Sequence, residues 1–343
     1  MKKFLFSLLS AVTILYPAPV CIGAQTLYPV VVNGRWGFVN NSGETVINPQ
    51  FDHAGGFAGG LAPVRMGRWG YVDGSGRMSV VPQFDKADVF SEGLAAVKLG
   101  GGGGDPFVPY DPRPFYHVGG GGRYGFINTD GKYAINPQFE DAGTFSGGLA
   151  PVRMGGHWGF VDKTGIVVIN PQFERAQSFS EGLAGIRAGG KWGFVDRTGK
   201  MTINSEFDDV GRFGKGLAPV RQGKHWGYID PAGKFVINPQ FDEAGAFSDG
   251  LAPVKQGKHW GFIDPAGKFV INPQFDGAAE FSGGLAPAKQ GKHWGFIDTT
   301  GKFVINPQYD DADPFVDGLA SVKSGGRFGY VDTTGKYIWN PSK

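Results

Sequence analysis

A basic residue stands directly before each of nine aromatic–glycine pairs in this 343-residue sequence. Such a row could form a cationic ladder for an anionic polymer, and its histidines could bind metal ions. It could equally be a solvent-facing strand position that pairs with an acid across a hairpin. Arginine and lysine, which are not normal metal ligands, share the position, so we favour the structural interpretation and expect no metal site. The residues of this basic ladder are Arg35, Arg68, Arg123, His157, Lys191, His225, His259, His293 and Arg327.

Two rows of acidic residues repeat with the same spacing. One row closes the run after each aromatic–glycine pair, and Asn40 and Asn128 replace aspartate in two of its copies. Asparagine caps a turn as well as aspartate does but cannot act as an acid or a base, so this row indicates turn capping. The other row could be a series of calcium sites, but the sequence has no dense D-x-D-x-D loop, which disfavours calcium. Its members are Asp52, Asp85, Glu140, Glu174, Asp208, Asp242, Asp276 and Asp310.

The sequence contains no motif for a reaction: no phosphate loop, no H-E-x-x-H and no recognisable Ser-His-Asp arrangement. We therefore expect a protein that is not an enzyme and has no cofactor. The competing class is a glycan-processing enzyme, which would need a pair of acids outside the repeated positions. Asp105 and Asp111 are the acids that the sequence offers there.

Residues 1–24 are predicted to be a secretory signal peptide. Lys2 and Lys3 precede an apolar stretch of about 13 residues, which is too short to span a bilayer, and Ala24 ends a run of small residues. The alternative is a lipoprotein anchor on Cys21, the single cysteine. Cleavage after Ala24 removes two of the 33 basic residues and leaves 31 against 31 acidic ones. This balance disfavours nucleic acid as a partner, and we expect a periplasmic or extracellular protein without a membrane span.

The aromatic–glycine pairs belong to a unit of about 34 residues that fills residues 25–343. Each unit has three short runs rich in aromatic and β-branched residues, such as 225–230, 234–238 and 251–255, and we predict three strands. A connector at 239–250 carries two phenylalanines that we expect to be buried against the neighbouring unit. Burial between units is likewise predicted for the tryptophans, with stacking on sugars as the alternative, since the following glycine permits close approach. These tryptophans are Trp36, Trp69, Trp158, Trp192, Trp226, Trp260 and Trp294.

The array resembles the bacterial WG-repeat family. The resemblance covers residues 28–340 and rests on the motifs W-G-[FY]-[IV]-[DN], V-I-N-P-Q-[FY]-[DE] and F-x-x-G-L-A, with Tyr124 and Phe328 replacing tryptophan in two copies. It implies an extracytoplasmic or surface interaction module and brings no catalytic residues. For the fold we expect an all-β tandem array of nine three-stranded units in an open superhelix. A closed ring is the alternative. The open superhelix is favoured over it, because 34 residues is short for a four-stranded propeller blade and nine exceeds the usual four to eight blades.

One hairpin between units is interrupted by an insertion at residues 99–122, in which glycine runs flank an aromatic and proline-rich tip. Loops of this length are usually functional or disordered, and aromatic and arginine side chains often anchor interfaces. The tip is therefore a candidate contact site, and the alternative is a tolerated, floppy loop. Its residues are Phe107, Tyr110, Arg113, Phe115, Tyr116 and His117. The function expected from the whole sequence is a non-catalytic, exported scaffold that binds a protein or a polymer at the cell envelope. The alternative is a glycan-binding or glycan-processing envelope protein, and the sequence leaves the ligand and the binding face open.

Overall fold

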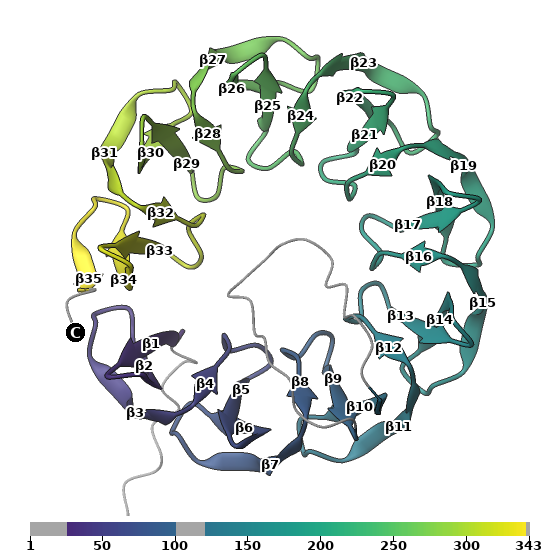
Figure 1. Cartoon of the computed structure of the whole chain (residues 1–343), viewed down its shortest axis with the longest axis vertical. Helices are drawn as coiled ribbons and strands as arrows, with labels where there is room; N and C mark the ends of the chain where they lie inside the picture. The colour runs from purple at the N-terminus through teal and green to yellow at the C-terminus, as the bar shows by residue number, and fades with distance from the viewer. Residues whose placement is uncertain (1–25, 101–120, 341–343) are drawn as a thin grey trace, which may run out of the picture.

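The computed structural model describes residues 26–100 and 121–340. Within them, strands form nine separate antiparallel sheets, eight of four strands and one of three. The sheets stand side by side as blades around a ring, and the chain visits them in order (Figure 1). The protein is therefore a nine-bladed β-propeller, and the expectation of an open superhelix is wrong. Blade one is β1–β3, and each later blade takes the next four strands, up to β32–β35 in blade nine.

In a four-stranded blade, a two-residue first strand pairs with the second strand, the second with the third and the third with a long fourth strand. The first strands are β4 (His53–Ala54), β8 (Lys86–Ala87), β12 (Asp141–Ala142), β16 (Arg175–Ala176), β20 (Asp209–Val210), β24 (Glu243–Ala244), β28 (Gly277–Ala278) and β32 (Asp311–Ala312). The second strands are β1 (Tyr28–Val32), β5 (Leu61–Met66), β9 (Leu94–Leu99), β13 (Leu149–Met154), β17 (Leu183–Ala188), β21 (Ala218–Gln222), β25 (Ala252–Gln256), β29 (Leu285–Gln290) and β33 (Leu319–Ser324).

The third and fourth strands form the outer half of each blade, and the fourth strands lie on the outer rim (Figure 1). The third strands are β2 (Arg35–Val39), β6 (Arg68–Asp73), β10 (Arg123–Asn128), β14 (His157–Asp162), β18 (Lys191–Asp196), β22 (His225–Ile229), β26 (His259–Ile263), β30 (His293–Asp298) and β34 (Arg327–Asp332). The fourth strands are β3 (Thr45–Phe51), β7 (Met78–Phe84), β11 (Tyr133–Phe139), β15 (Val167–Phe173), β19 (Met201–Phe207), β23 (Phe235–Phe241), β27 (Phe269–Phe275), β31 (Phe303–Tyr309) and β35 (Tyr337–Trp339).

The prediction of three strands per unit missed the short first strand. In blade seven this strand is β24, where Glu243 pairs with Lys255 and Ala244 with Val254. The next ladder bond runs from the N–H of Gly245 to the carbonyl of Pro253, so the proline takes part without needing an N–H. Two residues are too few to show the period-two pattern by which a strand is recognised in a sequence.

The glycine of each tryptophan–glycine pair lies directly beneath the backbone of the fourth strand. In blade six, Trp226 pairs with Phe241 and Tyr228 pairs with Ile237, so residues 238–240 bulge over Gly227. A Cβ atom on Gly227 would lie 2.4 Å from the carbonyl oxygen of Ile237. This contact confirms that the glycine is required for close backbone approach, although the approaching strand belongs to the same blade.

Neighbouring blades pack through aromatic rings and through the glycine of the turn between the third and fourth strands. Phe247 of the connector lies 4.9 Å from Tyr228 of the preceding blade, measured between ring centroids, which confirms the predicted burial against a neighbour. Gly233 has a φ of 82°, and a Cβ there would lie 3.2 Å from Cγ2 of Ile203 in the preceding blade. The turn glycine therefore serves both the turn and the blade interface.

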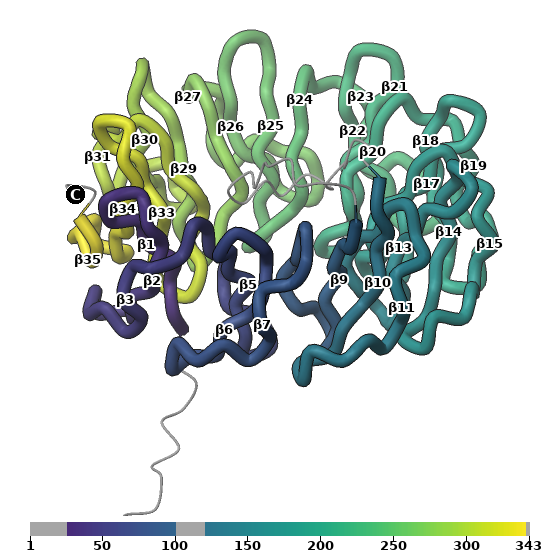
Figure 2. Tube along the Cα trace, turned by 60° about the horizontal axis from the view of Figure 1, so that its bottom comes forward, coloured from purple at the N-terminus to yellow at the C-terminus, as the bar shows by residue number. Residues whose placement is uncertain are grey.

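The ring closes by packing of blade nine against blade one, which lie side by side in Figures 1 and 2. The rings of Tyr28 and Tyr330 are 5.4 Å apart, and the Tyr330 hydroxyl donates to the carbonyl of Pro29 at 3.0 Å. Gly43 of blade one faces the backbone carbonyl of Ile338 in β35, whereas the other turn glycines face an isoleucine or valine side chain of the preceding blade. Because each interface repeats the same rotation, nine blades complete a circle, and the usual range of blade numbers was a poor guide.

Candidate functional site

All nine residues of the basic ladder are exposed at the first position of a third strand. Six of them pair with an acid of the second acidic row, which supports the structural interpretation. These pairs are Arg35 with Asp52, Arg68 with Asp85 at 3.7 Å, Arg123 with Glu140 at 3.8 Å, Lys191 with Asp208, His225 with Asp242 at 3.8 Å and His259 with Asp276 at 3.8 Å. Residues 26–100 and 121–340 contain no group of three or more side chains that could hold a metal ion.

The same acids also cap the hairpins between the second and third strands. The Gly257 N–H donates to Oδ2 of Asp242 at 2.7 Å, and six other copies repeat this bond. Glu140 additionally lies 3.7 Å from the Arg153 guanidinium. At Asp52 the bond from the Gly67 N–H, with help from Arg35, lowers the pKa of the carboxyl. These acids therefore stabilise the hairpins between the second and third strands.

The first acidic row caps turns, as predicted. Asn40 Oδ1 accepts the backbone N–H groups of Ser42 and Glu44, and all nine copies repeat these two bonds. At Asp162 the hydroxyl of Thr164 also donates to the carboxylate, and it is the main cause of the lowered pKa of Asp162.

A circle of aromatic side chains follows one edge of the ring, at the second position of every third strand. We call it the aromatic circle. Its members are Trp36, Trp69, Tyr124, Trp158, Trp192, Trp226, Trp260, Trp294 and Phe328. Between blades one and two, His53 lies between two of its rings, 6.2 Å from Trp36 and 6.4 Å from Trp69 by ring centroids. We call the position of His53, the first residue of each short strand, the insert position.

The insert position varies from blade to blade. It holds His53, Lys86, Asp141, Arg175, Asp209, Glu243, Gly277 and Asp311. The cross-strand neighbour of each insert is always basic, and each of these cations pairs in turn with a member of the aromatic circle. Lys255 shows both contacts, because its Nζ lies 2.7 Å from Oε1 of Glu243 and 6.0 Å from the ring centroid of Trp260. Three further lysines lie over their rings at 5.4–5.8 Å.

The predictions made from the sequence did not include this row of cations. Its signal was present, because the fifth residue of the run L-A-P-V-K is basic in eight copies: Arg65, Lys98, Arg153, Arg187, Arg221, Lys255, Lys289 and Lys323. The burial predicted for the tryptophans is complete at Trp69 and Trp192, each 6% exposed. The other five are half-buried and keep part of the indole accessible.

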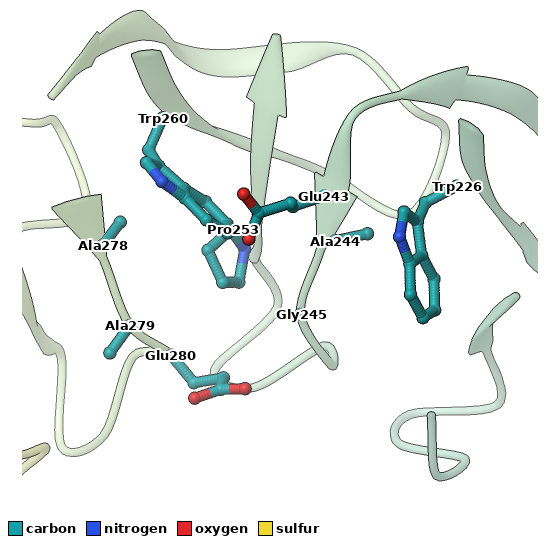
Figure 3. Close-up of a pocket in the computed structure, with 9 residues that line it drawn as sticks. All are labelled: Trp226, Glu243, Ala244, Gly245, Pro253, Trp260, Ala278, Ala279 and Glu280. Atoms are coloured by element: carbon teal, nitrogen blue, oxygen red, sulfur yellow. The ribbon is translucent and has the colours of Figure 1, made fainter. Parts of the chain in front are cut away.

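A cavity of about 230 Å³ lies along the inner part of blades six to eight. Figure 3 shows Trp226 and Trp260 at two sides of it, with Glu243 and Pro253 between them and Glu280 below. We call it the Trp226–Trp260 hollow. Its remaining lining is small: Ala244, Gly245, Ala278 and Ala279.

Small side chains of blades seven and eight form much of the wall of the hollow. The first strand and its continuation read Glu-Ala-Gly-Ala at 243–246 and Gly-Ala-Ala-Glu at 277–280, whereas blade five reads Arg-Ala-Gln-Ser at 175–178. Glu280 is also the only acid at its position among the eight copies. These departures from the repeat were visible in the sequence, but their meaning depends on the side-by-side placement of the two blades.

Burial raises the pKa of three carboxyls on or beside the inner strands, namely Asp88, Asp141 and Asp313. Asp141 is 4% exposed, and burial raises its pKa to about 7, against the opposing effects of the Ala142 N–H and of Lys86. Burial also raises the pKa of Asp88 to about 6. These acids lie within the repeats, whereas Asp105 and Asp111, which the sequence offered as an acidic pair, lie outside the described residues. So do the candidate contact residues of the insertion: Phe107, Tyr110, Arg113, Phe115, Tyr116 and His117.

The chain belongs to the family described as WG containing repeat. The model of this family matches eight segments that together span most of the sequence: residues 36–68, 69–102, 124–157, 158–192, 192–224, 226–258, 260–292 and 294–327. The family resemblance seen in the motifs is thereby confirmed. No curated protein matches the sequence.

Solved structures resemble the chain in fold at low sequence identity. A crystal structure of the eukaryotic initiation factor superposes with a TM-score of 0.61 and 12% identity, over 91% of this chain and 95% of that one. The dihydro-heme d1 dehydrogenase NirN gives a TM-score of 0.47 and 11% identity, over 92% of this chain and 72% of NirN. PorZ of Porphyromonas gingivalis gives 0.35 and 12%, over 93% of this chain and 51% of PorZ. The first of these likenesses supports the fold alone.

Across residues 26–100 and 121–340, no helix has the length and apolar character needed to cross a membrane.

Proposed function

We propose that this propeller is a non-catalytic scaffold that binds a protein or a polymer through the edge of the ring that carries the aromatic circle. The observation behind the proposal is the repeated grouping of a half-buried aromatic ring, a cation and an exposed ladder residue around that edge. Tryptophan and arginine are the side chains that most often anchor interfaces. The repeated acids and amides are occupied in capping, which leaves the edge suited to binding and not to a reaction.

We further propose that the protein is exported and acts at the cell envelope. The support is the signal-like character of residues 1–24. Fractionation of cells that express the full chain, beside cells that express residues 25–343, tests this. Recovery of both forms in the cytosol would contradict export.

The binding edge is tested by capture of partners from envelope extract with two variants of matched charge. In one, His225, His259 and His293 at the ladder edge become glutamate. In the control, Lys234, Lys268 and Lys302 become glutamine; these exposed residues lie at the opposite edge, beyond the other ends of the third strands. Each variant changes the formal charge by minus three, with histidine counted as neutral.

We expect the ladder variant to capture less partner and the control to match the wild type. The ladder ion pairs are exposed, so their loss should cost little stability. Equal capture by both variants would contradict binding at this edge.

A further inference from the structure

The Trp226–Trp260 hollow has the composition of a pocket for one cationic side chain. Two indoles and Pro253 supply flat and apolar walls, and a carboxylate lies at one end. Its volume of about 230 Å³ is below the range of about 300–1,000 Å³ that is usual for small-molecule sites. The hollow therefore suits a single side chain better than a whole cofactor.

Two carboxylates line the hollow, and within the described part of the chain only one of them is paired with a cation. Glu243 is bound by Lys255 at 2.7 Å, so this pair is close to neutral. Among the described residues, no cation forms an ion pair with Glu280. Its Oε1 lies close to the Cα of Gly245, since a Cβ on that glycine would be 3.2 Å from it. In blade eight the residue of the cation row is Lys289, and its Nζ lies over the ring of Trp294.

Resting on the proposed binding function, we propose that the hollow takes an arginine side chain of a protein partner. The guanidinium binds the Glu280 carboxylate, and its flat face and aliphatic stem pack against the indoles and Pro253. Arginine fits better than lysine because its planar group stacks on aromatic rings and can bind a carboxylate through two N–H groups. The proposal thus selects a protein partner over a neutral polymer.

The other blade interfaces within the described residues lack this carboxylate. At the position of Glu280 they hold Gly56, Val89, Thr144, Ser178, Arg212, Ala246 and Pro314, none of which is an anionic group. At the position of Gly245, blade five holds Gln177, which is 6% exposed and donates from Nε2 to the Val210 carbonyl of blade six at 3.2 Å. Blade five also has Gly185 in place of Pro253, and a Cβ there would lie 2.7 Å from Oε1 of Gln177, so the glutamine fills this space. The hollow is a local specialisation of a repeated frame.

The test is an NMR titration of the purified protein with ¹⁵N-labelled tryptophan. The probe is N-acetyl-arginine amide, and its citrulline counterpart is the neutral control of the same shape. Single Trp226→Phe and Trp260→Phe variants assign the two indole N–H signals. We expect saturable shifts of these two signals with the arginine compound only. Equal shifts with the citrulline compound, or no saturable shift at either indole, would overturn the proposal.

Two variants locate the interaction at the carboxylate and in the space beside it. Glu280→Gln should weaken binding at least about tenfold, because it replaces a charge-assisted hydrogen bond. Gly245→Gln combined with Pro253→Gly should block the hollow and keep the fold, because blade five carries this pair natively as Gln177 and Gly185. Glu206→Gln, at an exposed site on the outer strand β19, removes the same charge and should leave binding unchanged. Binding by Glu280→Gln equal to that of the wild type would contradict the assignment.

The result for arginine binding in the hollow can be distinguished from the result for partner binding at the ladder edge. If Glu280→Gln loses arginine binding and also captures less envelope partner, the hollow is the anchor of the edge. If the titration fails while the ladder variants still affect capture, the assignment of the hollow is wrong and the binding edge stands.

Discussion

The interface between blades one and two and the Trp226–Trp260 hollow are built on the same backbone register. In the first, the His53 ring lies between Trp36 and Trp69, and Trp69 is fully buried. In the second, Glu243 occupies the same position but is exposed and paired with Lys255, and small residues follow it. The repeated residues thus hold the blades together, while the few residues that differ decide whether the space between two aromatic rings is filled or open.

Replacing one tryptophan with alanine in each region should give the largest difference in stability between the two regions. Trp69→Ala is expected to lower the free energy of unfolding by about 3–5 kcal/mol, the usual cost of truncating a large aromatic side chain in a core. Trp260→Ala should cost roughly half of that, since its indole is already partly exposed. Urea denaturation of both variants measures the difference. Equal losses would mean that the hollow is no looser than the filled interface.

A third interface fills the insert position with a buried acid, and this should make stability depend on pH. Asp141 has a folded-state pKa of about 7, whereas an unfolded aspartate titrates near about 3.9. Between these values the folded protein holds a proton that the unfolded chain has lost. The free energy of unfolding should therefore fall as the pH rises through this window, by at most about 1.4 kcal/mol per unit, and the effect vanishes below about pH 4.

Asp141→Asn should flatten this dependence between pH 5 and pH 7 in urea denaturation. Lys86 and Arg153 limit the rise of the Asp141 pKa. The pKa values of Asp88 and Asp313 are raised in the same direction, so part of the slope should remain in the variant. Glu206→Gln on the outer rim is the control and should keep the full slope. An unchanged slope in Asp141→Asn would show that Asp141 is ionised in the folded protein at pH 5.

Alanine at the tryptophan–glycine pairs should affect both regions alike. The added Cβ would lie 2.4 Å from the Val80 carbonyl oxygen at Gly70, and 2.5 Å from that of Ile271 at Gly261. Because backbone must move in either case, each substitution should cost about 1–3 kcal/mol. Thermal or urea unfolding of Gly70→Ala and Gly261→Ala checks this. A cost at one site only would show that the hollow relaxes the blade beside it.

The smallest effect on stability is expected when the filled interface between blades one and two is opened. His53→Gly removes the ring between Trp36 and Trp69 and should cost on the order of 1 kcal/mol, the size of an aromatic pair contribution. It should also increase acrylamide quenching of indole fluorescence. The double variant Gly245→Gln, Pro253→Gly in the hollow should reduce quenching instead. Unchanged quenching in His53→Gly would mean that the neighbouring blades close over the gap.

Much of the fold could be predicted because it depends on contacts within one unit. Asp230, Gly233 and the aromatic runs specify two strands and the turn between them, and the turn caps, the hairpins and the role of Gly227 follow from local geometry. Prediction failed where a signal was too short, as in β24, or where it lay in one copy of a repeat, as at Glu280. The contact residues expected in the insertion stay a prediction.

The sequence by itself determined the nine-fold unit, its strands, its caps and its membership of the WG-repeat family, because each of these depends on residues a few positions apart. Only the tertiary structure decided that the array closes. Closure depends on the small rotation between blades, which is set by contacts such as Gly233 against Ile203 and is summed over nine interfaces until Tyr330 meets Tyr28. It also decided that the small side chains of two successive blades share one hollow, because residues one repeat apart become neighbours only when the blades pack.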